Sequence, residues 1–309
     1  MCGSYNGVTF FEMKKAVEFN NIKLKIGNAL ILDDISFDID EGDIYGLIGH
    51  NGAGKTSLIR ILLGLISNYS GSLKIYSDDK PIRQRTLIGS VIDSLEADGR
   101  ATVKNYIHRI CCMTGCGSTD FENRIIRLVG LTGEVKKPIS NLSLGMKRRL
   151  LIACAMANQP KLLVLDEPFN GIDPEGMADF RLLFQQLSSE GITILITSHN
   201  IPELLKLSNK FGIMYKGHFI GEIRDTELSK FQKTKTVFST AEPQHLVDEL
   251  KKMFPQQECY ADSPGEISLF DEIDSARQEE LRKLSTGIRI ATMSEEEILL
   301  WKMNGHKDV

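Results

Sequence analysis

The residues best suited to chemistry lie in a glycine-rich loop between a predicted buried strand, residues 44–48, and a predicted helix, residues 56–65. Glycines let backbone N–H groups close around phosphate oxygens, and the start of the following helix adds a favourable dipole. Lys55 is placed to neutralise phosphates, and the hydroxyl of Thr56 is placed to bind Mg²⁺. The pattern predicts a phosphate-binding site formed by Gly49, His50, Asn51, Gly52, Ala53, Gly54, Lys55, Thr56 and Ser57.

Two adjacent carboxylates, Asp166 and Glu167, follow directly after four apolar residues, 162–165. The apolar run predicts a buried strand, and open α/β sheets bind ligands at the carboxyl ends of their strands. Asp166 can hold Mg²⁺ through water, and Glu167 can orient and deprotonate an attacking water. Strand ends are often acidic, so the pair gains its meaning from the glycine-rich loop that precedes it.

Between and after these two elements lie short motifs that resemble those of ABC ATPases. Residues 142–146 read Leu-Ser-Leu-Gly-Met and resemble the family signature, with Leu144 in place of a glycine and Met146 in place of a glutamine. Residues 170–174 are similar to the family's dimer-contact loop, and His199 follows a strand as the switch histidine does. The resemblance covers residues 16–223.

The resemblance implies a site completed by two copies packed head to tail, either a homodimer or a heterodimer with a related cassette. Each ATP, with its Mg²⁺, would lie between the phosphate loop of one copy and the signature of the other. Ser143 and the Gly145 backbone would then contact the γ-phosphate held by the second copy, because they begin a helix. His199 would contact the γ-phosphate and the region of Glu167; its plain alternative is a histidine at a strand end.

Two positions depart from the family pattern. The aromatic residue that stacks on adenine is replaced by Ile26, so stacking would be weaker unless Phe19 or another residue substitutes. The glutamine of the loop that couples nucleotide to the permease is replaced by Asp93. We assign Asp93 to catalysis and to the metal, and the alternative is an exposed loop acid.

The elements that position these residues alternate between buried strands and helices, which predicts an α/β fold with a largely parallel core sheet. The resemblance implies a P-loop cassette with an antiparallel β subdomain and a helical signature subdomain. The pattern places turns at Gly27-Asn28 and Asp33-Asp34, helices within residues 100–158, and a short helix at residues 204–207.

The domain boundaries follow from changes of pattern. We assign residues 13–225 to the cassette and residues 226–309 to a small α+β accessory domain of strand-helix-strand-strand-helix-strand order, with its second helix at residues 275–284. Residues 1–12 do not fit the pattern and are predicted to form a disordered tail, with Met13 as an alternative start of translation.

Composition narrows the function classes. The chain of 309 residues is 42% hydrophobic and 25% charged, with a net charge of −4, which gives no electrostatic footprint for nucleic acid. No stretch offers the roughly 18 consecutive apolar residues of a membrane span. We therefore expect a cytoplasmic protein, peripheral on the inner face of the membrane, docked on a permease with transmembrane helices.

The six cysteines are interpreted as small apolar side chains that fill space in helices: Cys2, Cys111, Cys112, Cys116, Cys154 and Cys259.

Residues 143–150 and 158–162 are similar to the bacitracin- and lantibiotic-type exporter and immunity ATPases. The favoured hypothesis is an ATPase that energises export of an antimicrobial peptide or another amphipathic cargo. The alternative is an ATP-gated regulatory module with little hydrolysis. The departures at Ile26 and Asp93 favour it, and four intact residues oppose it: Lys55, Asp166, Glu167 and His199. A soluble ABC ATPase of translation or DNA repair is disfavoured, because the chain has one cassette and no sustained heptads.

Overall fold

The chain divides into two units, at Glu222 and Ile223. A computed structural model describes residues 14–77, 85–92, 99–230, 234–254, 259–263, 265–269, 281–282 and 284–304. The predicted tail, residues 1–12, lies outside these ranges, as do Asp93 and most of the helix predicted at residues 275–284.

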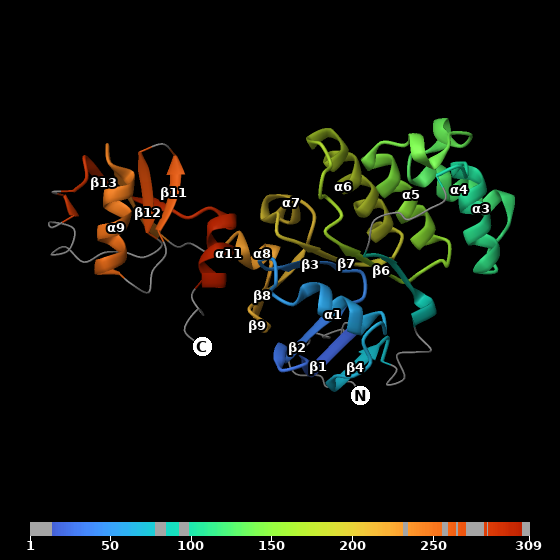
Figure 1. Ribbon diagram of the computed structural model, residues 1–309, viewed down its shortest axis with the longest axis horizontal. Helices are drawn as coiled ribbons and strands as arrows, with labels where there is room; N and C mark the ends of the chain where they lie inside the picture. Colours follow the sequence, from blue (N-terminus) through green and yellow to red (C-terminus); the bar gives the residue numbers. More distant parts are fainter. Residues whose placement is uncertain are drawn as a thin grey trace, which may run out of the picture. The chain divides into compact units, whose positions relative to one another are not determined.

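A six-stranded sheet forms the centre of the first unit (Figure 1). Neighbouring strands within the order β5-β6-β7-β3-β8 pair in parallel, and β9 returns beside β8 after a tight turn at Lys216 and Gly217. The strands β3, β6 and β7 are buried along their whole length, in agreement with their largely apolar sequences. In sheet order the strands are β5 Ile88–Val91, β6 Leu162–Asp166, β7 Thr193–Ser198, β3 Ile44–Ile48, β8 Lys210–Tyr215 and β9 His218–Arg224.

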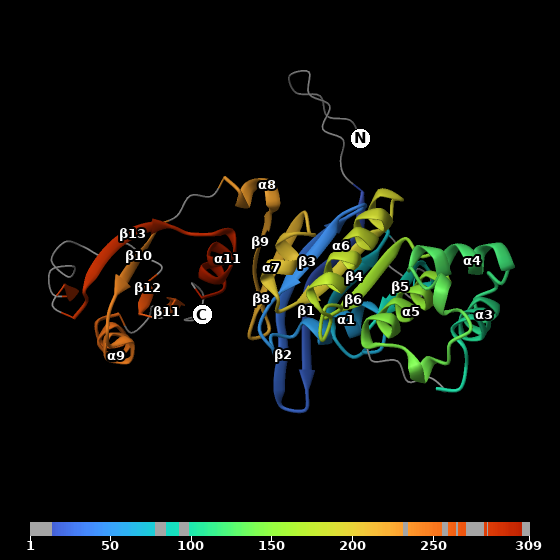
Figure 2. The same cartoon turned by 90° about the horizontal axis from the view of Figure 1, so that it is seen from above.

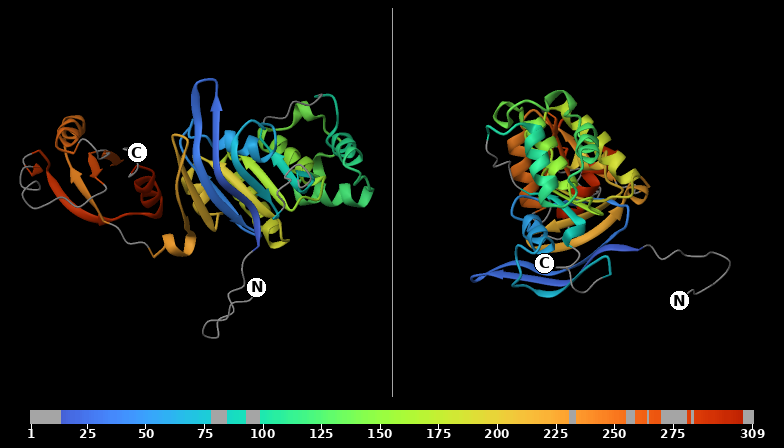
Figure 3. Two further views of the ribbon diagram at one scale, coloured as in Figure 1. Left: turned by 90° about the horizontal axis from the view of Figure 1, so that it is seen from below. Right: turned by 90° about the vertical axis from the view of Figure 1, so that its right-hand side faces the viewer.

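A three-stranded antiparallel sheet of order β2-β1-β4 packs against the same unit, and its long β1–β2 hairpin is visible in Figure 3. Its strands are β1 Lys15–Ile26, β2 Ala29–Asp40 and β4 Ser70–Ile75. One apolar core joins the inner faces of both sheets with the helix α1, Lys55–Leu62. The phosphate loop is thus anchored on a helix that is buried between two sheets.

The helices α5, α6 and α7 lie on the opposite face of the six-stranded sheet, and α3 and α4 pack against α5 (Figures 1 and 2). Each of the longer ones has a side-chain cap at its first turn: Thr102, Ser118, Ser143 and Asp173 accept backbone N–H groups of α3, α4, α5 and α6. None of the described helices is both long enough and apolar enough to cross a membrane. The helices are α3 Val103–Met113, α4 Thr119–Leu128, α5 Leu144–Met156, α6 Pro174–Ser189 and α7 Ile201–Leu205.

Three details differ from the predictions. The predicted turn at Asp33-Asp34 is wrong: β2 runs through it as a bulge, with Asp34 at φ 60° and an irregular register opposite Ile22 and Leu24 of β1. The helix after the phosphate loop ends at Leu62 rather than at residue 65, because Gly64 takes φ 75°. The short helix α7 begins three residues early, since Asn200 caps it.

The second unit contains a four-stranded antiparallel sheet of order β11-β12-β10-β13. Its core joins Phe238, Ile267 and Leu269 of the sheet to Leu246 and Leu250 of α9. Alternating apolar positions on the strands and on α9 account for this packing. The elements are α8 Asp225–Leu228, β10 Thr234–Ser239, α9 Pro243–Met253, β11 Cys259–Ser263, β12 Glu266–Leu269, β13 Gly287–Thr292 and α11 Glu295–Asn304.

Candidate functional site

The phosphate loop connects β3 to α1 and depends on glycine at two points. Gly52 and Gly54 adopt φ 84° and 102°, a left-handed conformation that side chains disfavour. A Cβ atom on Gly54 would lie 2.6 Å from Leu32 Cδ2 of β2, and one on Gly49 would lie 2.7 Å from the Met214 carbonyl oxygen of β8. The loop therefore packs tightly against both sheets while His50 and Asn51 stay exposed at its tip.

Lys55 folds back into the loop. Its Nζ donates to the carbonyl oxygens of Gly49 at 2.6 Å and His50 at 3.3 Å, and its side chain is only 6% exposed. Burial lowers the pKa of Lys55, and the charges of Glu167 and Asp166 oppose that shift. A phosphate entering the loop would add negative charge beside this buried ammonium, which already lies 3.8 Å from Glu167 Oε1.

Asp166 joins the phosphate loop to the two central strands. Its Oδ2 accepts a hydrogen bond from the Thr56 hydroxyl at 2.8 Å, and its Oδ1 accepts one from the Thr197 hydroxyl. Parallel pairing of β6 with β7 places Asp166 opposite Thr197, so both side chains meet at the carboxyl end of the sheet. Hydroxyl and carboxylate oxygens are the ligands that Mg²⁺ prefers, and the fit of these residues to that ion is good.

Hydrogen bonds hold both the backbone and the side chain of Glu167 at the carboxyl end of the same sheet. It adopts φ 49°, and its backbone N–H donates to the Thr197 carbonyl at 3.0 Å. One carboxylate oxygen, Oε2, accepts from the Ser198 hydroxyl at 3.3 Å and lies 3.0 Å from His199 Nδ1. The other, Oε1, is buried without a hydrogen-bond partner and lies 3.8 Å from Lys55 Nζ. A buried acceptor without a donor is costly, so Oε1 is suited to receive a water proton.

His199 is positioned by its neighbours on both sides. Its backbone N–H also points at Glu167 Oε2, at 3.4 Å, and the Ser198 hydroxyl accepts from the backbone of Asn200 at 2.9 Å. Asn200 in turn caps α7 through the Glu203 N–H at 3.3 Å. The imidazole is half exposed, so one edge of it is free to contact a phosphate.

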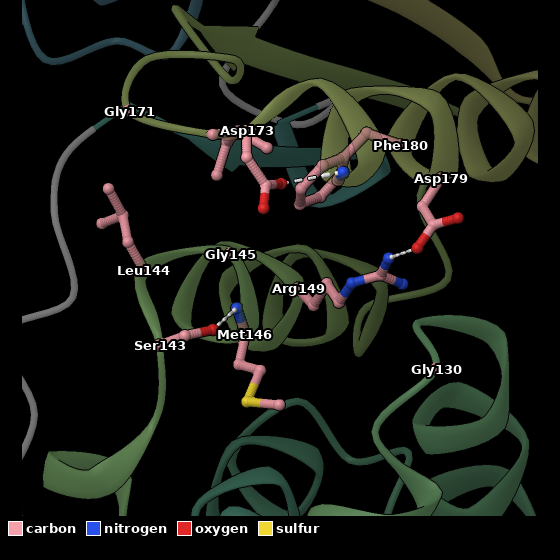
Figure 4. A pocket seen from close by; sticks show the side chains of 12 residues that line it. Gly130, Ser143, Leu144, Gly145, Met146, Arg149, Gly171, Asp173, Asp179 and Phe180 are labelled. Atoms are coloured by element: carbon pink, nitrogen blue, oxygen red, sulfur yellow. Dashed lines mark hydrogen bonds and ion pairs between the residues drawn. The ribbon is translucent and has the colours of Figure 1, made fainter.

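The signature residues line a separate cleft of about 570 Å³ between the start of α5 and the start of α6 (Figure 4). Ser143 is exposed and its hydroxyl accepts from the Met146 N–H at 3.2 Å, which leaves the hydroxyl proton free for a ligand. Leu144, 51% exposed, covers Gly171 of the predicted dimer-contact loop. The lining of this cleft includes Gly145 but no residue of the phosphate loop.

The remaining predicted residues are those at the two departures from the family pattern, Ile26 and Asp93, together with Phe19. Ile26 lies at the end of β1, 57% exposed beside the hairpin turn. Phe19, its suggested substitute for adenine stacking, is 1% exposed and packs 4.8 Å from Phe37, so that suggestion is wrong. Asp93 lies outside the described residues, and its role stays a prediction.

The sequence did not predict a role for two residues that the structure places at these sites, Thr197 and Arg149. Thr197 bonds Asp166 through its hydroxyl and Glu167 through its carbonyl, and its signal was a hydroxyl at the end of a β-branched strand. Arg149 donates to the Val129 carbonyl at 3.0 Å and to Asp179 at 2.7 Å, and it stacks 5.2 Å from the Phe180 ring (Figure 4). Its signal was the basic run after the signature.

A glycine loop between the buried strand β3 and the helix α1, with paired acids at the carboxyl end of β6 in the same sheet, defines a P-loop nucleotide-binding protein. The model of the ABC transporter family matches residues 32–170. The chain is 32% identical over 296 residues to the bacitracin transport ATP-binding protein BcrA of Bacillus licheniformis, covering 93% of this chain and 95% of that protein. This chain belongs to the ABC transporter family, as one of its ATP-binding proteins.

Other relatives agree with that assignment. The lantibiotic transport ATP-binding protein SrtF of Streptococcus pyogenes is 36% identical over 206 residues, covering 67% of this chain and 90% of SrtF. Among solved structures, a nucleotide-free ATP-binding cassette from an ABC transporter matches with a TM-score of 0.64 at 22% identity, covering 70% of this chain and 94% of that one. That structural likeness shows the fold alone, and it confirms the predicted α/β cassette.

Proposed function

We propose that this chain hydrolyses Mg-ATP and that hydrolysis powers export of an antimicrobial peptide or another amphipathic cargo through a separate membrane permease. The observation that carries the proposal is the arrangement of Glu167, whose Oε2 is fixed by Ser198 and His199 while its Oε1 stays buried and unbonded. A carboxylate held in this way is suited to act as general base.

The roles follow from the contacts. Backbone N–H groups of the phosphate loop and Lys55 bind the phosphates, and Thr56 with Asp166 would hold Mg²⁺. When bound, the ion would neutralise negative charge on the phosphates. Glu167 takes a proton from the attacking water, and its hydrogen bond to His199 orients the carboxylate. Asp93 is proposed to assist at the metal.

Completion of the site is proposed to need a second cassette, identical or related. Ser143 and the α5 N-terminus at Gly145 would contact the γ-phosphate held by that copy, because a helix N-terminus favours anions. The open cleft in front of Ser143 and its available hydroxyl proton support this role.

The permease partner and the location are proposed from the names of the relatives. BcrA and SrtF are named as transport ATP-binding proteins, which supports docking of this chain on a membrane partner at the inner, cytoplasmic face. The proposal that the exported cargo is a bacitracin-like or lantibiotic-like peptide rests on the names of those two relatives. No role in nucleic-acid binding is proposed.

The test is Mg-ATP hydrolysis by the purified full chain beside Glu167→Gln, with size-exclusion chromatography in the presence of ATP. Loss of a general base lowers turnover by about 10²–10⁴-fold. We expect that loss with ATP binding retained and an ATP-bound dimer trapped. Glu190→Gln, at the far end of α6 and paired with Arg124, serves as the matched control.

Two outcomes contradict the proposal. Normal turnover by Glu167→Gln would remove Glu167 as the base. Tight ATP binding without turnover by the wild-type chain, both alone and with its permease, would favour the ATP-gated regulatory module instead.

A further inference from the structure

An ion pair joins the helix α6 to the short helix α7, which begins two residues after His199. Glu203 of α7 accepts a hydrogen bond from the guanidinium of Arg181 on α6 at one carboxylate oxygen, Oε2. Its other oxygen, Oε1, accepts from Lys206 Nζ at 2.8 Å. The Glu203 side chain is 10% exposed and that of Lys206 is 55% exposed, so the contact with Arg181 is the buried one. Neither Arg181 nor Glu203 lines the signature cleft or belongs to the phosphate loop.

The Glu203 carboxylate depends on its two cationic partners. Burial disfavours the charged form and raises the pKa of Glu203, but the hydrogen bonds from Lys206 and Arg181 outweigh burial, so the pKa is lowered overall. The group is therefore a carboxylate at neutral pH. A buried carboxylate that loses a partner is left without compensation for its charge. Arg181 thus determines where the Glu203 side chain can lie.

The helix α7 is too short to keep its place by helix propensity alone, since it has five residues. Ile201 and Leu204 are buried and hold one side of it. Glu203 is bonded twice on the other side: its backbone N–H donates to Asn200 Oδ1 at 3.3 Å, and its carboxylate accepts from Arg181. Glu203 therefore connects the cap of α7 directly to α6.

The cap of α7 is in turn connected to Glu167. Asn200, which caps α7, donates its backbone N–H to Ser198 Oγ at 2.9 Å, and that hydroxyl donates to Glu167 Oε2 at 3.3 Å. His199 lies between these two residues and contacts the same Oε2 through its ring at 3.0 Å and its backbone N–H at 3.4 Å. A displacement of α7 would therefore move the imidazole relative to the Glu167 carboxylate.

The helix α6 is a firm support for this connection, because it is held on two sides. Asp179, two positions before Arg181, accepts from Arg149 of α5 at 2.7 Å. Side chains two positions apart on a helix point about 200° apart, so the two bonds leave α6 on nearly opposite sides. Figure 1 shows α6 between α5 and α7, and both α6 and α7 pack against β7.

We propose that Arg181 is a positioning residue for His199: through Glu203 and the cap of α7, it holds the imidazole beside Glu167 Oε2 in the geometry that hydrolysis requires. This role rests on the proposed function, in which Glu167 is the general base. Without Arg181, α7 loses its bond to α6 and the imidazole loses its fixed place. Displacement of a catalytic group by about 1 Å can lower turnover about 10²-fold.

The experiment measures kcat and KM for Mg-ATP in the purified full chain and in variants of this ion pair. Arg181→Gln should lower kcat about 10- to 100-fold, because the imidazole is displaced from the carboxylate that it contacts. KM should stay within about two-fold of the wild-type value, since neither Arg181 nor Glu203 belongs to the phosphate loop. Thermal melts followed by circular dichroism establish that each variant is folded at the assay temperature.

Three further variants act on the same carboxylate. Arg181→Lys keeps a positive charge, and Arg181 reaches Glu203 through one nitrogen, Nη1, so kcat should recover to within about three-fold of wild type. Glu203→Gln leaves no buried carboxylate to compensate, so it should fold readily and still lower kcat about three- to ten-fold, because bonds to an amide are weaker. Lys206→Gln is the matched control: it removes the exposed partner of Glu203, so kcat should change by no more than about two-fold.

A double-mutant cycle with His199→Ala separates positioning from general damage. Because Arg181 acts through the imidazole, Arg181→Gln should lower turnover by no more than about two-fold once the imidazole is absent. Single-turnover measurements with enzyme in excess over ATP detect slow hydrolysis by His199→Ala.

A second measurement reads the imidazole without any hydrolysis. The chain has six histidines, and the NMR resonance of the His199 ring in ¹³C-histidine-labelled protein is the one that disappears in His199→Ala. Arg181→Gln should move this resonance, whereas Lys206→Gln should leave it in place. Absence of turnover by the wild-type chain and its permease would contradict the proposed function, and the resonance would still decide the role of Arg181.

A kcat of folded Arg181→Gln within about two-fold of wild type would overturn the proposal. So would an equal loss in Lys206→Gln, because the charge balance of Glu203 rather than its bond to α6 would then control turnover. Losses for Arg181→Gln and His199→Ala that multiply in the double variant would give Arg181 an independent structural effect instead. An unchanged His199 resonance in Arg181→Gln would show that the imidazole does not depend on Arg181.

Discussion

The phosphate site and the signature cleft lie in the same unit, yet they are built differently. At the phosphate site most polar side chains already have partners within the chain: Lys55 caps two carbonyls, and Asp166 accepts from Thr56 and Thr197. At the signature cleft, Ser143 and Leu144 are exposed, and within the described ranges the Ser143 hydroxyl is bonded only to the backbone of its own helix. The side chains of the phosphate site are therefore already held in place by contacts within one chain. The signature cleft instead exposes polar and apolar groups that a second cassette could contact.

This difference separates binding from turnover. A prepared site loses little conformational freedom when ATP binds, so the single chain should bind nucleotide by itself. The open cleft contributes only when another cassette brings a phosphate to it, so it should matter for hydrolysis and not for the first binding step. Substitutions at each of the two sites therefore test whether ATP binding and ATP hydrolysis depend on different residues.

The largest effect is expected for Lys55→Met. Hydrogen bonds to charged groups contribute about 1.5–3 kcal/mol, which corresponds to a loss of ATP affinity of about 10- to 150-fold. Isothermal titration of the single chain measures it, with Lys104→Met, exposed on α3, as the control. An affinity within two-fold of wild type would contradict the prepared phosphate site.

The sequence predicted the residues of both regions through their motifs, but not how each region is completed. Motif spacing was enough to predict Lys55 and the acid pair. Lys55 belongs to a local loop motif, and Asp166 and Glu167 follow directly after a single apolar strand. The role of Thr197 could not be predicted, because it depends on the parallel register that sets Asp166 opposite a residue 31 positions away. The bulge at Asp34 was missed for the same reason, since its left-handed φ is supported by a bond from Asn21 across the hairpin.

The signature side is tested by Ser143→Asp against Ser143→Asn. Both replacements keep a good helix N-cap, so α5 should stay intact in each. Asp adds a negative charge where a phosphate is expected, and like charges brought together cost several kcal/mol, so turnover should fall by at least about 30-fold. Asn should reduce it only a few-fold. ATP affinity of the single chain should be unchanged in both, and a drop in that affinity would mean that the two regions are not independent.

A smaller effect is expected for Thr197→Val, which leaves Asp166 with one hydroxyl donor fewer. The loss of a buried hydrogen bond costs about 1–2 kcal/mol, so Mg²⁺ should be needed at about ten-fold higher concentration for ATP binding. Thr193→Val lies on the same strand, where its hydroxyl accepts from the Gly42 N–H at 3.0 Å, and it serves as the control. Thr193→Val should lower stability without changing the Mg²⁺ requirement; the same Mg²⁺ shift in both variants would assign the effect to the strand as a whole.

The smallest effect is expected for Arg149→Lys, which tests whether the cleft can be loosened without touching the phosphate site. The guanidinium spans the Val129 carbonyl and Asp179 at once, and an ammonium cannot reproduce that fork. We expect a loss of about 1 kcal/mol, seen as a melting temperature lower by about 2–4 °C, with turnover reduced two- to three-fold. Arg127→Lys, exposed on α4, is the control. Because Arg149 holds α5 against α6 and touches no residue of the phosphate loop among its recorded bonds, ATP affinity should stay at the wild-type value. Weaker ATP binding in Arg149→Lys alone would show instead that the packing of α5 on α6 is transmitted to Lys55 and Asp166 within one chain.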